Sequence, residues 1–389
     1  MVRTGGPGVG TEADTRAYAR SMSNQERDPD ERLCSAGDPR AGIEVLTHRD
    51  VPLGGPRAMD VRRTIPQRAR SLVGAWCFCD HYGPDDVSRG PGMQVPPHPH
   101  TGLQTVTWLF EGEVLHRDSL RSLETVRPGE LNLMTAGRGI SHSEETPRGS
   151  REARLHGVQL WVALPSSRAG GPPAFEHRSN LPTVLALGAR VEVFVGSLGL
   201  GGRVVTSPAM VHTPLVGAQV DLDPGSEVTL DVSEGFEHGL LVDAGDVTLE
   251  GVRVPPSSLA YVGTGRTSLT VAASSDGPAR MILLGGEPFE EDVVMWWNFV
   301  GRTHEDVAEA RAAWSAQLAT GSRDSDGSGG SGGADGSGGS DGSDAPDGRV
   351  TGFVEGADEM RFGETVGYDG PPLPAPRLPD VRLRPRRRA

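Results

Sequence analysis

Apolar and polar residues alternate in many short runs between about residues 43 and 300, and turn residues separate the runs. Residues 104–110 (QTVTWLF) are rich in β-branched and aromatic side chains, and the turn at Gly112 returns the chain along residues 114–117. In residues 155–162, successive side chains would point to opposite faces of a strand. Strands this closely spaced, with no helices between them, predict an all-β barrel or sandwich.

The second half of the chain repeats this pattern. Its expected strands cover residues 219–222, 228–232, 239–242, 259–262, 269–272 and 281–284. The string LNLMTAGR beginning at Leu131 can be aligned with LAYVGTGR beginning at Leu259, and the turns at Gly112 and Gly245 also correspond. We therefore interpret the two halves as divergent copies of one barrel.

One helix is expected after the last strand. Residues 301–320 predict a helix, because Thr303 can cap its start and an apolar stripe follows at helical spacing. The stripe consists of Val307, Ala310, Trp314 and Leu318. The aromatic run MWWNF at residues 295–299 is expected to pack this helix against a barrel.

The remaining segments are polar. Residues 1–42 have no apolar run and are interpreted as a disordered N-terminal extension. Residues 321–348 are rich in Gly, Ser and Asp, which predicts a flexible linker. Residues 349–389 form a tail whose apolar side chains we expect to dock partly onto the core.

Composition excludes several classes of function. The formal net charge of -14 and the pI near 5.3 argue against direct binding to nucleic acid, which requires excess positive charge. All 38 basic residues are arginine, so the chain has neither a Schiff-base lysine nor a phosphate-loop lysine. No run of about 18 apolar residues is present, so we expect no membrane span. We expect a cytoplasmic monomer without a signal peptide.

The cysteines do not indicate a disulfide framework or a metal site. Cys34, Cys77 and Cys79 are too few for a framework, and the last two lack the two-residue gap of a zinc or redox pair. We interpret them as small apolar residues in a reducing compartment.

Two histidine motifs carry the candidate chemistry. The first is H-P-H at His98 and His100, and the second is H-S-E at His142 and Glu144. Residues i and i+2 of a strand project from one face, so each motif can direct two side chains into a barrel. On two strands that face each other, three imidazoles and one carboxylate would converge on one point. Such mixed donors suit a divalent transition metal, namely Fe, Mn, Ni, Cu or Zn, rather than Ca or Mg.

The other histidines have weaker functional interpretations. Among 11 histidines an isolated H-x-H pair arises by chance, so the prediction depends on both motifs together. His156 is either a residue of the metal pocket or a hydrogen-bonded core histidine. His81 and His116 lie near the motif strands, whereas His212 and His238 stand alone and are interpreted as surface or packing residues.

Three strings resemble the pirin family of cupins. They are HPHTGLQTVTWLFEGEVLHRDS from His98, RPGELNLMTAGRGISHSEE from Arg127 and LHGVQLWVALP from Leu155. The resemblance is close over residues 45–164 and looser to residue 318. It implies an all-β bicupin of two double-stranded β-helix (jelly-roll-like) barrels, over residues 43–165 and 166–300.

The resemblance also implies one metal, usually Fe(II), in the first barrel. Its ligands would be His98, His100, His142 and Glu144. Aligning the halves places Thr270 opposite His142 and Ala272 opposite Glu144, so we expect no metal in the second barrel.

The sequence departs from the family pattern at one position. Gln104 stands where many pirin-like sequences have a glutamate. This difference removes a second carboxylate near the site without removing an expected ligand. We expect Gln104 to change the hydrogen bonds around the metal pocket.

Two functions follow from the resemblance. The first is a dioxygenase of the quercetinase type, which would open a flavonol such as quercetin with O2, with Glu144 as the base that removes the substrate's 3-hydroxyl proton. The second is a non-catalytic, metal-containing regulatory protein that senses redox state and binds a protein partner. Fold does not distinguish them. A wide cavity open to the metal favours the enzyme, and a site closed by side chains favours the sensor.

Overall fold

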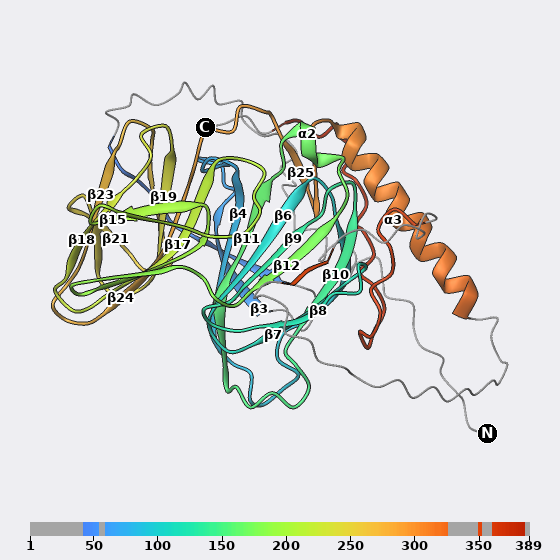
Figure 1. Ribbon diagram of the computed structural model, residues 1–389. Helices are drawn as coiled ribbons and strands as arrows, with labels where there is room; N and C mark the ends of the chain where they lie inside the picture. Colours follow the sequence, from blue (N-terminus) through green and yellow to red (C-terminus); the bar gives the residue numbers. More distant parts are fainter. Residues whose placement is uncertain (1–41, 54–58, 326–348, 352–359, 386–389) are drawn as a thin grey trace.

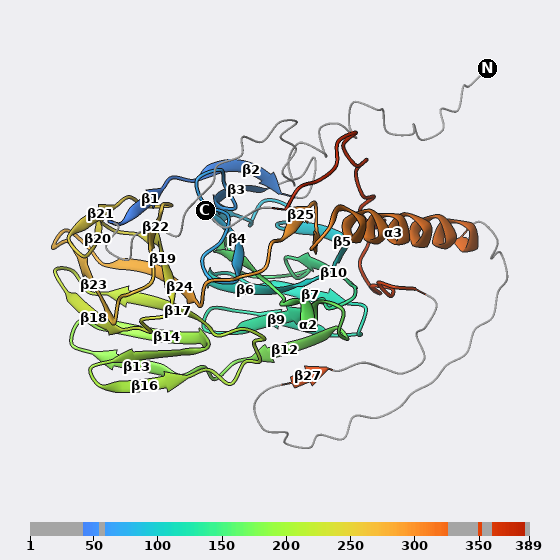
Figure 2. The same ribbon diagram turned by 90° about the horizontal axis from the view of Figure 1, so that it is seen from above.

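Two β-barrels lie side by side in the computed structural model, and a long helix packs on the outside of one of them (Figure 1, Figure 2). The structure describes residues 42–53, 59–325, 349–351 and 360–385. The prediction of an all-β molecule with two barrels is confirmed. The expected extension at residues 1–41 and most of the expected linker, residues 326–348, lie outside the described residues.

The N-terminal barrel is made of a four-stranded and an eight-stranded sheet. In spatial order, the smaller sheet contains β5 (Gln94–His100), β10 (Ile140–Glu145), β7 (Val114–Asp118) and β8 (Leu123–Val126). The larger sheet contains β2 (Arg49–Leu53), β3 (Met59–Ile65), β4 (Trp76–Asp86), β11 (Arg154–Ala163), β6 (Leu103–Glu111), β9 (Leu131–Thr135), β12 (Ala174–Arg178) and β27 (Arg349–Thr351). Apolar side chains from both sheets, including Val61 and Val95, share one buried cluster between them.

The C-terminal barrel also has two sheets. The seven-stranded sheet contains β1 (Glu44–Leu46), β22 (Leu259–Val262), β19 (Glu237–Ala244), β24 (Ala279–Gly286), β17 (Leu215–Leu222), β14 (Ala189–Val195) and β13 (Thr183–Ala186). The six-stranded sheet contains β16 (Arg203–Thr206), β15 (Ser197–Leu200), β18 (Glu227–Asp231), β23 (Ser268–Ala273), β20 (Val247–Leu249) and β21 (Val252–Val254). Alternating valines and leucines fill the space between them.

The two barrels share a strand order, as expected of divergent copies. Strands β18, β23, β20 and β21 follow one another in the same order as β5, β10, β7 and β8. In β23, Leu269 and Val271 are buried, whereas Thr270 and Ala272 are half-buried on the other face. The sequence alignment, which placed Thr270 opposite His142, was therefore wrong by one residue, a shift that exchanges the two faces of a strand. The inward side chains of β23 are apolar.

Two strands cross the boundary that we expected at residue 165. Strand β1 comes first in the described chain but pairs with β22 of the C-terminal barrel. Strand β12 follows residue 165 but pairs with β9 of the N-terminal barrel. Each strand covers a sheet edge that would otherwise expose unpaired backbone groups. The expected domain limits therefore differ from the structure at both ends of the first barrel.

The outer face of the eight-stranded sheet packs against the seven-stranded sheet of the second barrel (Figure 2). Two tryptophans bridge the barrels. Trp76 donates from Nε1 to the carbonyls of Val216 (3.2 Å) and Gly285 (3.1 Å). Trp108 donates from Nε1 to Oε1 of Gln219 over 2.8 Å. Strands β4, β6 and β11 are thus covered on both faces, which explains their nearly continuous burial.

The expected helix is present as α3 (His304–Ser325), which extends beyond residue 320. Thr303 caps it, since its Oγ1 accepts the backbone N–H of Asp306 over 3.2 Å. A four-residue helix, α2 (Ser166–Ala169), lies between β11 and β12 of the N-terminal barrel. Among the described residues, no helix combines the length and the apolar character needed to cross a bilayer.

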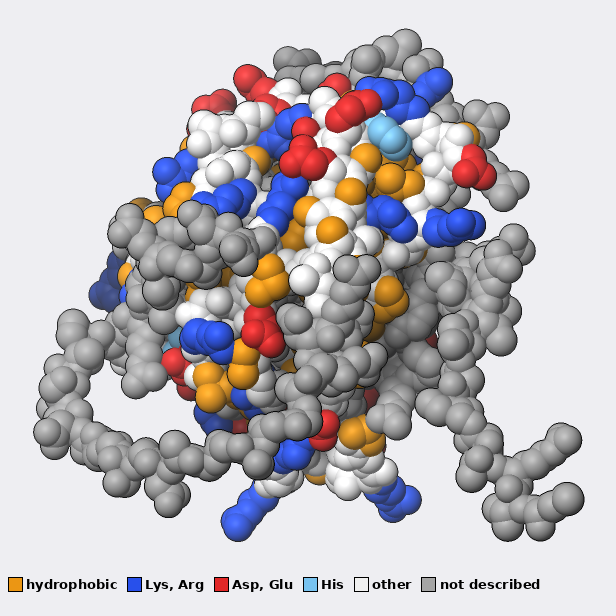
Figure 3. All heavy atoms as spheres, turned by 90° about the vertical axis from the view of Figure 1, so that its right-hand side faces the viewer, with side chains coloured by type: hydrophobic (Ala, Val, Ile, Leu, Met, Phe, Trp, Pro, Cys, Tyr) orange, Lys and Arg blue, Asp and Glu red, His pale blue; other side chains and the backbone are white. Residues whose placement is uncertain are grey.

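The described part of the tail packs against α3. Phe362 and Leu373 are buried in one cluster with Trp314 of α3, and Trp314 Nε1 donates to the Leu373 carbonyl over 2.8 Å. The same tail reaches the N-terminal barrel, because the Leu373 N–H donates to the Pro97 carbonyl and the Ser141 N–H donates to the Phe362 carbonyl. Arginines and acidic side chains are interspersed on this side of the molecule (Figure 3).

Candidate metal centre

The two histidine motifs lie on neighbouring strands. Strands β5 and β10 are hydrogen-bonded antiparallel partners, and His142 is directly opposite His98 in their register. We expected the two strands to face each other across the barrel, and this detail was wrong. Directly opposed residues of antiparallel strands hold their side chains close together on one face. Adjacency therefore brings the imidazoles together more directly than the expected arrangement would.

A β-bulge lies beside the motifs. Between the pairs His142–His98 and Glu144–Val95, β10 has one residue and β5 has two, Pro96 and Pro97. Proline has no N–H to donate to a ladder, so a bulge is one of the few strand positions that tolerates it. The two prolines thus interrupt the regular pairing of β5 with β10 just before His98, and the pairing continues on both sides of the bulge.

The three histidines converge in the barrel interior. One ring nitrogen from each of His98, His100 and His142 lies within 4.8 Å of the others. All three side chains are buried. Burial lowers the pKa of His98 to about 4 and lowers the pKa of His100 and His142 well below the usual value. The imidazoles are therefore neutral, which is the form that binds a metal.

Backbone carbonyls define the tautomers of two of these rings. His98 Nδ1 lies 2.9 Å from the Pro96 carbonyl, and His100 Nδ1 lies 3.1 Å from the Asn298 carbonyl. A carbonyl only accepts, so both Nδ1 atoms carry the proton and donate it. Each ring keeps the lone pair of Nε2 for a metal, an arrangement typical of metal-binding histidines.

The third ring is oriented by residues that the sequence analysis did not assign. His142 Nδ1 lies 3.5 Å from Nδ1 of His116, whose Nε2 lies 3.1 Å from Oδ2 of Asp118. Asp118 also accepts the backbone N–H groups of Leu120 and Ser122, which hold its carboxylate in place. If His116 donates to Asp118 and accepts from His142, then Nε2 of His142 has a free lone pair. That atom is buried and has no hydrogen-bond partner.

Glu144 lies at the side of this group. Its carboxylate lies within 4.8 Å of ring nitrogens of His142 and His116, but the four predicted donors do not all lie within that distance of one another. Thr107 Oγ1 donates to Glu144 Oε1 over 3.0 Å. Burial raises the pKa of Glu144. The structure therefore places Glu144 beside a three-histidine centre. The donors fit one divalent transition metal, which His98, His100 and His142 would hold.

A small cavity adjoins these side chains. Its volume is about 40 Å³, room for roughly three water-sized groups. Phe78 and Trp161 form part of its wall as stacked rings with centroids 4.0 Å apart. Arg63 also lines it and makes two hydrogen bonds, of 2.6 and 2.7 Å, to the carboxylate of Asp80. Pockets that enclose drug-sized ligands are typically about 300–1,000 Å³, so this cavity is narrow.

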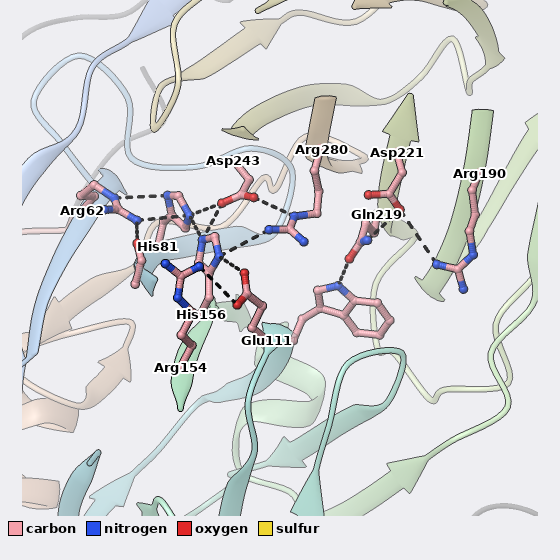
Figure 4. Close-up of polar contacts among 12 residues, drawn as sticks. Arg62, His81, Glu111, Arg154, His156, Arg190, Gln219, Asp221, Asp243 and Arg280 are labelled. Atoms are coloured by element: carbon pink, nitrogen blue, oxygen red, sulfur yellow. Dashed lines mark hydrogen bonds and ion pairs between the residues drawn. The ribbon is translucent and has the colours of Figure 1, made fainter. Parts of the chain in front are cut away.

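A second buried cluster of metal-ligand residue types lies between the barrels (Figure 4). His81 of β4 and His156 of β11 both place Nε2 2.7 Å from Oδ1 of Asp243, which belongs to β19 of the other barrel. The two Nε2 atoms are 3.1 Å apart. This cluster resolves the two interpretations of His156: it is a hydrogen-bonded core histidine. The face of β11 that carries it packs on the second barrel.

Arginines give these two histidines the opposite tautomer (Figure 4). Arg62 Nε donates to Nδ1 of His81, and a guanidinium nitrogen of Arg280 lies 3.4 Å from Nδ1 of His156. The Asp243 carboxylate only accepts, and both Nε2 atoms lie 2.7 Å from its Oδ1, so both Nε2 atoms carry protons and both Nδ1 atoms can accept from the arginines. Burial alone would raise the pKa of Asp243, but hydrogen bonds from His156 and His81 lower it far below the usual value. The cluster is thus a satisfied hydrogen-bond network.

The structure also shows the surroundings of Gln104, the cysteines and His238, which the sequence had singled out. Gln104 donates to Thr135 Oγ1 and to the Met210 carbonyl, and it does not line the cavity, so its expected effect on the pocket was wrong. Cys77 and Cys79 are buried, free thiols in the apolar core, as predicted, whereas Cys34 lies outside the described residues. His238 is a buried packing residue.

Two antiparallel jelly-roll-like barrels and a histidine centre in the first define a bicupin. Family models agree: the Pirin model matches residues 58–162, and the Pirin C-terminal cupin domain model matches residues 217–318. The chain belongs to the pirin family.

The similarity to known proteins covers most of the chain. A Pseudomonas aeruginosa protein provisionally named quercetin 2,3-dioxygenase is 42% identical over 272 residues, which is 70% of this chain and 83% of that protein. A pirin-like protein of Caulobacter vibrioides is 36% identical over 66% of this chain and 88% of its own length. A crystal structure of quercetin 2,3-dioxygenase from Acinetobacter baumannii superposes with a TM-score of 0.71 at 35% identity, covering 88% of this chain and 97% of that one.

Proposed function

We propose that this pirin-family protein is a metal-dependent dioxygenase of the quercetinase type, which opens a flavonol with O2. The observation that carries the proposal is a neutral three-histidine centre with a buried carboxylate beside it. The names of the similar proteins from Pseudomonas aeruginosa and Acinetobacter baumannii support the same activity. We propose Fe(II) as the metal, with Mn, Ni, Cu and Zn as alternatives that the same donors accept.

The bound metal would supply an acidifying, electron-transferring centre for the substrate and O2. His98, His100 and His142 would hold it, and Glu144 would accept the proton of the flavonol 3-hydroxyl. The raised pKa of Glu144 suits this role, because a base is most effective when its pKa approaches the working pH. Thr107 orients the carboxylate through its hydrogen bond to Oε1. The stacked rings of Phe78 and Trp161 offer an apolar wall for an aromatic substrate.

The size of the cavity favours a second candidate function. A space of about 40 Å³ cannot contain a flavonol unless side chains of the wall move. A closed site with a metal is what a redox-sensing regulatory protein requires, with a protein partner that reads the metal's state. The enzyme proposal therefore requires that the wall opens for the substrate.

Oxygen uptake separates these two functions. The protein is reconstituted with Fe(II) without oxygen, and O2 consumption is then measured with quercetin for wild type, Glu144→Gln and Glu145→Gln. We expect Glu144→Gln to retain metal, bound more weakly, and to lose roughly 10²–10⁴-fold in rate, because an amide cannot accept the proton. Glu145 pairs with Arg117 over 3.0 Å and does not line the cavity, so its variant is the matched control.

Two outcomes would contradict parts of this proposal. If metal-loaded Glu144→Gln turns over flavonol at the wild-type rate, Glu144 is not the base. If metal-loaded wild type consumes no O2 with any flavonol, the dioxygenase proposal fails and the sensor function replaces it.

A further inference from the structure

A hairpin that follows the second barrel in the sequence contributes one residue to the wall of the metal cavity. Strands β25 (Val294–Trp296) and β26 (Phe299–Gly301) pair with each other, and Trp297 and Asn298 form the connection between them. Asn298 lines the same cavity as His98, His100 and His142. It thus approaches the metal centre from a segment that follows the second barrel in the sequence.

The hairpin is held firmly against β5. The Val300 N–H donates to the Thr101 carbonyl over 3.0 Å, and Phe299 forms a bridge with Thr101. Gly102 has a φ of +70°, and a Cβ at this position would lie 2.2 Å from the Val300 carbonyl oxygen, so the close approach requires glycine. These contacts fix the position of Asn298 relative to His100.

The turn contains backbone strain. Trp297 has a φ of +52°, in the left-handed region that bulky residues rarely adopt. Such strain persists only where surrounding contacts impose it, and it is frequent at ligand sites. Here the Trp297 ring is buried and packs edge-on against Phe299, with centroids 5.4 Å apart. The strained residue immediately precedes the one that lines the cavity.

The backbone and the side chain of Asn298 behave differently. The backbone carbonyl accepts from Nδ1 of His100, a role that any residue type could fill. The side chain is 1% exposed, and neither Oδ1 nor Nδ2 has a hydrogen-bond partner. Buried carboxamides in folded proteins nearly always have partners, so this amide is matched to a group that occupies the cavity.

We propose that the Asn298 side chain contacts the exogenous ligand of the metal centre and selects anionic oxygen donors, namely carboxylates and deprotonated hydroxyls. Its Nδ2–H groups donate to the ligand's oxygen, and its Oδ1 accepts from any neighbouring hydroxyl. The cavity supplies no lysine, and its arginine, Arg63, is already engaged with Asp80. Among the described residues, two neutral donors without partners therefore line the cavity, the Asn298 amide and the Tyr82 hydroxyl. Of these, Asn298 is the one whose own backbone carbonyl bonds His100 of the three-histidine centre. This inference rests on the proposed function only in assuming that the centre takes a ligand.

The test is a binding titration of the metal-loaded protein without oxygen, with formate and quercetin as separate probes. Formate is small enough for a cavity of about 40 Å³. Asn298→Leu keeps the size and the backbone carbonyl but removes the amide, and Asn298→Ala is the second variant. We expect both to keep the wild-type metal content and to bind formate roughly 10- to 100-fold more weakly, the loss typical of a hydrogen bond to a charged group.

Asn298→Asp should bind formate more weakly still, because a carboxylate repels the anion. Asn132→Ala is the matched control, since Asn132 is also buried but bonds His177 outside the cavity. Unchanged formate binding by Asn298→Leu and Asn298→Ala, loss of metal from both, or absence of formate binding to wild type would overturn the inference. If formate binding depends on Asn298 but quercetin does not bind, the inference stands and the flavonol proposal fails.

Discussion

In the described part of the chain, buried histidines gather both inside the first barrel and between the barrels, and the two clusters differ in chemistry. In the first barrel, His98 and His100 donate from Nδ1 to backbone carbonyls. Between the barrels, Nδ1 of His81 accepts from an arginine, and His156 has an arginine nitrogen beside the same atom. The first pair directs lone pairs to a common point, and the second pair directs protons to one carboxylate.

This difference shows that proximity of donors does not define a metal site. Both clusters have three donor atoms within a few ångströms and both are buried. What separates them is the group on the far side of each ring, because it selects the tautomer. The satisfied network between the barrels stabilises their contact, whereas the first cluster contains a buried His142 Nε2 without a partner.

The largest expected difference between the two clusters is in metal content after one histidine of each is replaced. His98→Ala removes a ring with a free Nε2 lone pair, so we expect the bound metal to fall from about one per chain to near zero. His156→Ala is the matched control and should retain the metal. Elemental analysis after reconstitution and desalting measures both. Equal loss in the two variants would show that the interface cluster also binds metal.

The free energy of unfolding should depend on the cluster between the barrels, which contains His81, His156 and Asp243. Asp243→Asn removes the charge that His81, His156 and Arg280 share, and breaking a buried charge network costs about 3–5 kcal/mol. Metal content should remain that of wild type. Chemical denaturation measures the free energy of unfolding. The control is Asp246→Asn, whose exposed pair with Arg253 should be worth at most about 1 kcal/mol. Similar stability losses in the two variants would contradict the assignment.

His116 should matter for the metal without binding it. His116→Phe keeps a ring stacked on Phe175 but removes the acceptor for Nδ1 of His142. Loss of such an orienting partner typically weakens metal affinity about 10- to 100-fold. Competition with a chelator measures this affinity, and Asp118→Asn should have a smaller effect of the same sign. His177→Phe, outside the centre, is the control. Complete loss of metal would instead make His116 a ligand.

His238 provides a third kind of buried histidine, with no hydrogen-bond partner on either nitrogen. Burial lowers its pKa to about 4. Between about pH 6.5 and pH 4 the unfolded chain therefore binds this proton and the folded chain does not, so wild-type stability falls as the pH decreases. His238→Leu removes this contribution, and its advantage over wild type should grow to about 1–3 kcal/mol by pH 4. Parallel stability curves would contradict this account.

The sequence alone was sufficient to predict the local features of the structure. β-Branched and aromatic residues predicted β6, alternating faces predicted β11, and Thr303 with its apolar stripe predicted the start of α3. The H-x-H and H-x-E spacing placed two side chains of each motif on one face of a strand. These features depend on neighbours within a few residues, which the sequence displays directly.

Only the tertiary structure decided which strands are neighbours and which tautomer each histidine adopts. His98 lies opposite His142 on the neighbouring strand, His100 bonds the carbonyl of Asn298, and His81 bonds Asp243. The partners in each pair are far apart in the chain. The exchange of β1 and β12 between barrels has the same origin, since it depends on which sheet edge is open. A hydrogen bond's partner is determined by the packing of distant segments, and that partner determines whether a histidine binds a metal or a carboxylate.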